Sequence, residues 1–359
     1  MNSMRINIML IVIDTLRYDY SLKVFSNIVP KHHGAIVFHN AFSTSTWTPP
    51  AHASIFTGRY PHQHGVLAWG EGVVPPLRVS SLASRLRLLE YNTYAVTANP
   101  AVPPFIGKGF SHVIEVNVGK RRFLHFSFPI VPLRAHYDPN NKFIKMIRKI
   151  IRGSYHLLTD IITLSEKYFG SQVVNQVIFN LFKSRVIKKP FFMFINYMDV
   201  HDYLAYMKFL NRCRTKITIH SKILAGAYQK ACMNQAQALR ELFDFLDKIG
   251  LLDSSAIIIT SDHGELLGEG GLVGHRNAYP FNELIHVPLA IYNPFNTKRI
   301  ELTKIISIKE IFNIALRYAQ EPEQPVAEYV KKLPEYVVVE DRTIGVKGKH
   351  YRAIIIPPI

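Results

Sequence analysis

The hydroxyl of Thr48 is a candidate nucleophile in this chain. Thr48 is followed by Pro49 and Pro50, and the residues at 51–57 predict a short helix. A threonine before two prolines is typical of a helix N-cap, because proline in the first turn sacrifices no hydrogen bond. The start of a helix also offers backbone N–H groups and a positive dipole end to a phosphoryl or sulfuryl group. Taken alone, the segment indicates either a plain helix cap or a site for an anionic ester.

Two carboxylates and an imidazole follow short apolar runs that are far apart in the sequence. Asp14 ends the run at 6–13, and Asp262 and His263 follow the run at 255–260. Continuous runs of branched apolar residues are typical of strands that are buried on both faces of a parallel sheet. Open α/β sheets bind their ligands at the carboxyl ends of such strands. We therefore expect these three side chains to meet at one edge of a sheet.

These groups and the threonine predict a site for one divalent metal ion, with Asp14, Thr48, Asp262 and His263 as ligands. An isolated threonine is a weak nucleophile, and a metal would lower the pKa of its hydroxyl and neutralise substrate oxygens. Two carboxylates, an alcohol and one imidazole suit Mn²⁺, Mg²⁺, Ca²⁺ or Zn²⁺. Each part also has a simpler interpretation by itself. Asp14 could cap a helix or pair with Arg17, and Asp262 and His263 could form a polar turn.

The order of these parts resembles the sulfatase family of the alkaline phosphatase superfamily. The segment 46–61 is similar to the family signature Cys/Ser-x-Pro-x-Arg, whose first residue becomes formylglycine. Here Thr48 takes the first position and His52 takes the arginine position. A threonine has neither a thiol nor a primary alcohol to oxidise, so formylglycine chemistry is closed to this chain. The resemblance implies a sulfatase-like fold whose nucleophile is the unmodified Thr48.

Further similarity runs from about residue 6 to about residue 295. The segment 191–201 resembles the strand that carries a substrate-contacting histidine, here His201, and the segments around His275 and at 283–289 resemble later family segments. The resemblance implies that His201 and His275 touch substrate oxygens or assist the leaving group. His52 could bind Thr48 or the substrate, or it could be a histidine packed on the helix face. Where many sulfatases have a second acid, this chain has Thr15.

Within the superfamily, the predicted ligand set is closest to single-metal phosphotransferases such as lipoteichoic acid synthases and phosphoethanolamine transferases. Nucleotide pyrophosphatases/phosphodiesterases also use threonine but bind two zinc ions. Asp199, His201 and His275 are candidates for a second site, but their spacing does not reproduce that group's pattern. We expect a metal-dependent hydrolase or transferase that cleaves phosphoester, or sulfate ester, bonds through a covalent Thr48 ester.

Alternating strands and helices predict an alkaline phosphatase-like α/β sandwich, in which helices flank a central, mainly parallel sheet. Strands are expected at 6–13, 35–39, 93–98, 190–197, 255–260 and 287–292. Helices are expected at 51–57, 80–90, 142–152, 156–168, 172–184, 224–248 and 308–320. We expect a catalytic domain at 1–295 and a short C-terminal subdomain at 296–359, with strands near 336–340, 343–346 and 350–356.

Composition limits the remaining possibilities. The chain has 359 residues, of which 48% are hydrophobic, and this is enough for one large core. Its two cysteines, Cys213 and Cys232, provide no disulfide framework and no cysteine metal site. The apolar run at 8–13 is too short to span a bilayer, so we expect a cytoplasmic protein.

The formal net charge of +17 is partly concentrated in a predicted helical insertion at 118–189. Between Lys120 and Arg152 there are nine Lys or Arg and one acid, and 142–152 predicts an amphipathic helix. Such a helix could lie on an anionic membrane, making the protein peripheral to it, bind a glycan acceptor, or simply cover the surface. The sequence contains no recognised nucleic-acid-binding module, so we expect no specific binding of nucleic acid. The alternative function is a non-catalytic sulfatase-fold protein that binds an anionic membrane or polyanion through this insertion.

Overall fold

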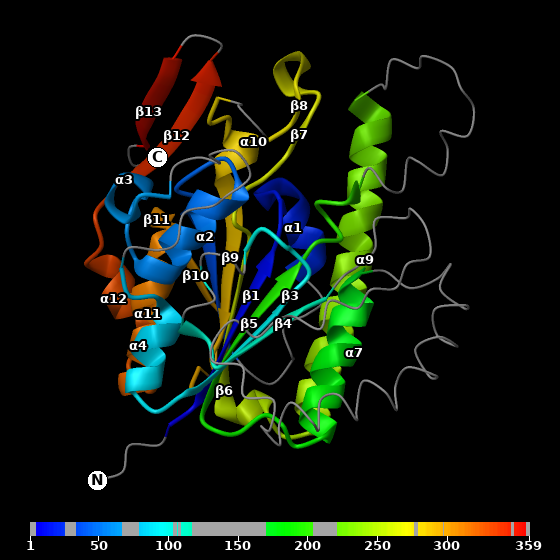
Figure 1. Ribbon diagram of the computed structural model, residues 1–359, viewed down its shortest axis with the longest axis vertical. Coiled ribbons are helices and arrows are strands. Elements are labelled where there is room, and N and C mark those ends of the chain that lie inside the picture. Colours follow the sequence, from blue (N-terminus) through cyan, green and yellow to red (C-terminus); the bar gives the residue numbers. More distant parts are fainter. Residues whose placement is uncertain are drawn as a thin grey trace, which may run out of the picture.

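The computed structural model in Figure 1 describes residues 5–25, 34–66, 79–102, 106, 109–116, 170–203, 221–275, 279–296, 298–345 and 348–356. The basic stretch at 120–152 and the helices expected at 142–152 and 156–168 lie outside these residues. None of the described helices is both long and apolar enough to cross a membrane.

A nine-stranded mixed sheet forms the centre of the molecule, in the order β10-β2-β9-β6-β1-β5-β3-β4, with β11 also paired to β2. The pairing is parallel except around β9, which is antiparallel to both β2 and β6. The strands are β1 Asn7–Ile13, β2 Ala35–Phe42, β3 Asn92–Thr97, β4 His112–Glu115, β5 Phe191–Tyr197, β6 Ser255–Thr260, β9 His286–Tyr292, β10 Ile300–Leu302 and β11 Ile306–Ser307. The predicted mainly parallel sheet is therefore confirmed.

Helices cover both faces of this sheet, which explains why its central strands read as continuous apolar runs. In β1, Ile8, Leu10 and Val12 face one core, and the residues between them face the other. The first core is closed by α2 Thr48–Thr57, α4 Leu82–Leu88 and α11 Ile311–Gln320, and the second by α1 Tyr18–Phe25, α7 Gly170–Lys183 and α9 Ser221–Lys248. Figure 1 shows the two groups on opposite sides of the sheet.

The C-terminal segments differ from their expected form. The three expected strands are two, β12 Val337–Gly345 and β13 Gly348–Ile356, which form an antiparallel hairpin. The break expected between 340 and 343 was wrong, because the backbone pairs without interruption there. The helix expected at 308–320 begins as a 3-10 turn, Ile308–Glu310, before α11. Strands β10 and β11, which follow residue 295, join the main sheet through β2.

The remaining elements are a small hairpin and several short helical segments. The small hairpin of β7 Leu266–Leu267 and β8 Val273–Gly274 follows β6 and encloses the 3-10 turn Glu269–Gly271. The short helices are α3 Pro61–His64, α10 Asn282–Ile285 and α12 Val326–Lys331, and a further 3-10 turn, Leu252–Ser254, precedes β6.

Candidate active site and metal centre

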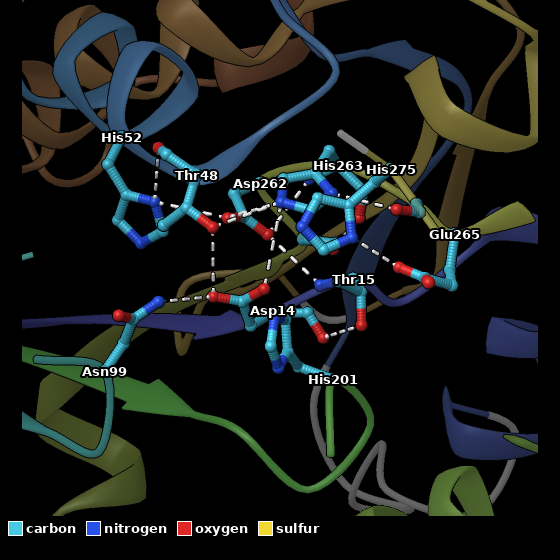
Figure 2. Close-up of polar contacts among 12 residues, drawn as sticks. Asp14, Thr15, Thr48, His52, Asn99, His201, Asp262, His263, Glu265 and His275 are labelled. Atoms are coloured by element: carbon cyan, nitrogen blue, oxygen red, sulfur yellow. Dashed lines mark hydrogen bonds and ion pairs between the residues drawn. The ribbon is translucent and has the colours of Figure 1, made fainter. Parts of the chain in front are cut away.

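The predicted metal ligands meet at the carboxyl edge of the sheet (Figure 2). Strands β1 and β6 are parallel neighbours with Val12 opposite Thr260, so Asp14 and Asp262 leave the sheet at the same level. One ligand atom from each of Asp14, Asp262 and His263 lies within 4.8 Å of the others. All three side chains are fully buried.

Helix α2 brings the threonine hydroxyl to this cluster. The structure corrects the expected cap: Trp47 is the N-cap, and Thr48 is the first helical residue. Thr48 Oγ1 lies 3.4 Å from Asp14 Oδ2, toward which it donates, and 3.2 Å from His263 Nε2. The plain-cap interpretation is wrong because the hydroxyl is directed at a carboxylate and an imidazole.

The orientation of His263 suits a metal ligand. Its Nδ1–H donates to the backbone oxygen of Gly264 at 2.8 Å, so Nε2 carries the free lone pair. Nε2 lies 3.4 Å from Asp262 Oδ2 and 3.8 Å from Asp14 Oδ1. Burial lowers the pKa of His263 to about 3, so the ring is neutral at physiological pH. Neutral imidazole is the form that binds metals.

The two carboxylates present unsatisfied oxygens to the same point. Asp14 Oδ1 and Asp262 Oδ2 have no hydrogen-bond partner among the described residues. Burial, and then the charge of Asp262, raise the pKa of Asp14 to about 6. Burial by itself would raise the pKa of Asp262, but its contacts with His263 and His52 lower it instead. Buried carboxylates are costly without a counter-charge, so this donor set fits a divalent cation.

Two residues that the sequence interpretation did not single out as site residues support these carboxylates. Asn99 Nδ2 donates to Asp14 Oδ2 at 2.8 Å, and the backbone N–H of Thr15 donates to Asp262 Oδ1 at 3.2 Å. Asn99 follows β3 as a polar residue at a strand's carboxyl end, which is the signal that identified Asp14. Thr15 occupies the position of the family's second acid, and its Oγ1 donates to the backbone oxygen of Asp14 at 2.7 Å.

His52 both packs on the helix face and contacts Thr48, the two environments that the sequence left open. Its ring is fully buried and meets Phe194 edge-on at 5.9 Å. Nδ1–H donates to the backbone oxygen of Thr48 at 3.1 Å and lies 3.4 Å from Asp262 Oδ2. Burial by itself would lower the pKa of His52, but Asp262 outweighs it and raises the pKa. His52 is thus a packed helix-face residue that also contacts a carboxylate of the candidate metal site.

His275 and His201 extend the cluster on its other side (Figure 2). The His275 ring lies 4.5 Å from that of His263 and 5.4 Å from that of His201. His275 Nδ1 contacts Glu265 Oε2 at 2.5 Å, and the sequence interpretation did not assign a role to Glu265. The structure thus brings both predicted histidines to the metal-site residues.

The charge of His201 suits an anionic substrate. Burial would lower the pKa of His201, but Asp202, 3.1 Å from its Nδ1, and the acids Asp14 and Glu265 raise it to about 9. Asp199 is directed elsewhere, because its Oδ1 accepts from the Ser171 N–H at 3.0 Å. Among the described residues, the group of acids and histidines positioned to hold a metal is Asp14, Asp262 and His263.

A comparison with family models identifies the relatives of this chain. The model described as Sulfatase matches residues 6–320. The chain belongs to the sulfatase family. Arylsulfatase K of Mus musculus is 27% identical over 161 residues, 43% of this sulfatase-family chain and 28% of that protein. The low-salt glycan biosynthesis sulfotransferase Agl7 of Haloferax volcanii is 39% identical over 71 residues, 19% and 18% of the two chains. The aligned stretches thus span less than a third of either relative.

The fold of this sulfatase-family chain also matches a solved structure. The phosphonate monoester hydrolase of Agrobacterium radiobacter superposes with a TM-score of 0.62 at 16% identity, covering 96% of this chain and 81% of that one. The sulfatase family and the alkaline phosphatase-like fold expected from the sequence are therefore confirmed.

Proposed function

We propose that this protein is a metal-dependent hydrolase or transferase that cleaves phosphoester, or sulfate ester, bonds through a covalent Thr48 intermediate. The observation that carries this proposal is the position of Thr48 Oγ1, 3.4 Å from Asp14 Oδ2 and 3.2 Å from His263 Nε2. The adjacent free oxygens of Asp14 and Asp262 supply the negative charge that a cation at this point needs.

One divalent ion, Mn²⁺, Mg²⁺, Ca²⁺ or Zn²⁺, would be held by Asp14, Asp262 and His263, with the Thr48 oxygen beside it. When bound, the ion supplies the charge that lowers the pKa of the threonine hydroxyl and offsets the charge of the ester. The chain itself fixes the ligands. Asn99 orients Asp14, and the Gly264 carbonyl directs the lone pair of His263 inward.

In the proposed reaction, Thr48 Oγ attacks phosphorus in line and the bond to the leaving oxygen breaks, forming a threonyl phosphoester. Asp14 Oδ2 is positioned to receive the hydroxyl proton, because it accepts from Thr48 Oγ1 at 3.4 Å. His275 and His201 stand where they can bind ester oxygens and give a proton to the leaving oxygen. Water, or an acceptor alcohol, then displaces Thr48.

A phosphoester is favoured over a sulfate ester by the nucleophile. The single-metal families that this site resembles use unmodified threonine for phosphoryl transfer, and the structural neighbour named above is a phosphonate monoester hydrolase. The glycan sulfotransferase relative supports transfer to a glycan acceptor as a second outcome. The non-catalytic alternative rests on the basic insertion, whose stretch at 120–152 lies outside the described residues.

The first prediction tests the nucleophile. We expect Thr48→Ala to reduce metal-dependent turnover of aryl phosphodiesters, phosphonates or sulfates by at least about 10³-fold, because losing a covalent nucleophile costs at least that much in comparable enzymes. Thr48→Ser should retain part of the rate. Intact-mass analysis of acid-quenched wild type should show an adduct that maps to Thr48.

Thr57→Ala is the matched control for this experiment, because Thr57 lies at the other end of α2 and its hydroxyl donates to the Ala53 carbonyl at 2.7 Å. Its turnover number should stay near that of wild type. Unchanged turnover of every substrate by Thr48→Ala would refute the proposed mechanism.

A further inference from the structure

We propose that Tyr228, on α9, is a positioning residue for the metal centre, acting on Asp262 through the backbone of Thr15. This inference rests on the proposed function, in which Asp262 is a metal ligand. Tyr228 belongs to the helix packed beside α1 and touches neither Asp14 nor Asp262 through a described hydrogen bond (Figure 1).

The turn after Asp14 holds Thr15 in an unfavourable conformation. Thr15 has φ 61°, in the left-handed region that a β-branched residue rarely adopts. Such a residue persists only where its surroundings hold it, and this commonly occurs at functional sites. Here the conformation directs the Thr15 N–H at Asp262 Oδ1, 3.2 Å away.

The hydroxyl of Tyr228 is the group that holds this turn. It donates to the backbone oxygen of Thr15 at 2.5 Å and accepts from the backbone N–H of Arg17 at 2.9 Å. The side chain is fully buried, and its ring meets those of Tyr20 and Tyr203 edge-on at 4.9 and 5.4 Å. Packing from two sides therefore fixes the hydroxyl between two peptide groups of the β1–α1 connection.

As a result, the two carboxylate oxygens of Asp262 have different surroundings. Oδ1 accepts from the N–H groups of Thr15, at 3.2 Å, and His263, at 3.0 Å. Oδ2 has no hydrogen-bond partner among the described residues and lies 3.4 Å from His263 Nε2. Without the tyrosine hydroxyl, the turn can relax and Oδ1 loses a donor, so the carboxylate is free to rotate away from the metal position.

The test measures Mn²⁺ affinity of the whole chain without substrate, from the electron paramagnetic resonance signal of free Mn²⁺. We expect Tyr228→Phe to weaken binding about 10-fold or more, the usual effect of losing a residue that orients a metal ligand. The matched control is Tyr94→Phe on β3, because the Tyr94 hydroxyl also donates to a carbonyl, Val186 O, and accepts from an amide, Lys188 N, each at 3.2 Å. Its Mn²⁺ affinity should equal that of wild type.

A rescue variant separates positioning from a general loss of packing. Glycine adopts positive φ readily, so Thr15→Gly should hold the turn without help from the tyrosine. In that background, Tyr228→Phe should change Mn²⁺ affinity by much less than it does alone. Equal affinity of Tyr228→Phe and wild type, or an equal loss in Tyr94→Phe, would overturn the inference while leaving the proposed function standing. A wild type that binds no divalent ion would overturn both.

Discussion

At the scale of single residues, three histidines of the site have a defined hydrogen-bond acceptor at Nδ1. The Nδ1 atoms of His52, His263 and His275 face a backbone carbonyl, a backbone carbonyl and a carboxylate, respectively. Because Nδ1 is the donor in each ring, Nε2 is left for other partners. In His263, Nε2 faces the candidate metal position. In His275, Nε2 is left for the space beside that position. The orientation of each ring is therefore decided by an acceptor behind it.

This leads to a prediction for Glu265, whose Oε2 lies 2.5 Å from His275 Nδ1. We expect Glu265→Ala to lower the turnover number for esters with alkyl leaving groups by about 10²-fold, a typical loss for a misplaced general acid. Nitrophenyl esters need little protonation of the leaving oxygen and should be affected much less. Glu265→Gln keeps an acceptor and should recover part of the rate. An equal loss for both kinds of ester would indicate a structural role instead.

The sequence was sufficient to predict which polar side chains meet at the candidate site, and less so which residues hold them. Asp14, Asp262 and His263 follow apolar strands, and this position identifies them without a structure. Asn99 has the same position, but one amide gives no chemical signal by itself. The distinction between N-cap and first helical residue at Thr48 depends on one backbone angle pair, which propensity cannot resolve. The role of Tyr228 depends on a contact across more than two hundred residues, which no local pattern encodes.

At the scale of elements, α2 is held in place by its neighbour α3. His64 in α3 accepts from the Val66 N–H at Nδ1 and meets the Ser54 hydroxyl of α2 through Nε2, each at 3.1 Å. Gly58, with φ 67°, ends α2, and a Cβ there would meet the ring of Phe312 at 3.0 Å. The C-terminal half of the helix that carries Thr48 is thus closely packed against its neighbours.

The buried ring of His64 gives a pH prediction. Burial lowers the pKa of His64 to about 4, below its value of 6.5 when unfolded. Between these two pH values, His64 is protonated in the unfolded chain but neutral in the folded chain. The contribution of neutral His64 to the free energy of unfolding is therefore complete above pH 6.5 and is lost as pH falls toward 4. Measured by urea unfolding, the free energy of unfolding of His64→Gln should fall less than that of wild type over this pH interval, by about 3 kcal/mol at most. Parallel pH profiles for the two proteins would contradict the prediction.

The elements themselves were predicted unevenly, for physical reasons. Buried strands such as β1 and β5 give strong signals because both of their faces are covered. The direction of β9 cannot be deduced from its own residues, since antiparallel pairing with β2 and β6 depends on where the chain returns. The short strands β10 and β11 are strands only because β2 offers them an edge. Tertiary pairing decides these cases.

At the scale of the whole molecule, the ionised Asp14 carboxylate opposes folding when no cation is present. Asp14 and Asp262 are fully buried side by side, and burial together with Asp262 raises the pKa of Asp14 to about 6 from 3.8. Because the folded state disfavours the ionised form, stability is reduced at neutral pH and recovers as pH falls from about 6 to 3.8. The buried Asp14 carboxylate thus lowers the stability of the metal-free protein at neutral pH.

We therefore expect Asp14→Asn to raise the free energy of unfolding in EDTA at neutral pH, by on the order of 3 kcal/mol. The same variant should lose stabilisation by metal, which in wild type should reach about 2.7 kcal/mol at a hundredfold excess over the Kd. Urea denaturation with EDTA and with Mn²⁺ measures both effects. A less stable variant in EDTA, or one that metal still stabilises, would be inconsistent with this assignment.

The order of strands in the sheet also sets the order in which the chain can fold during synthesis. β1 lies between β5 and β6, so it has no sheet neighbour until residue 191 has left the ribosome. β2 must wait longer, because all of its partners begin at His286 or later. Two apolar strands thus remain unpaired until segments far along the chain have been synthesised, and late pairing of distant segments is slow. We expect the nascent chain to depend on chaperones that bind extended apolar segments.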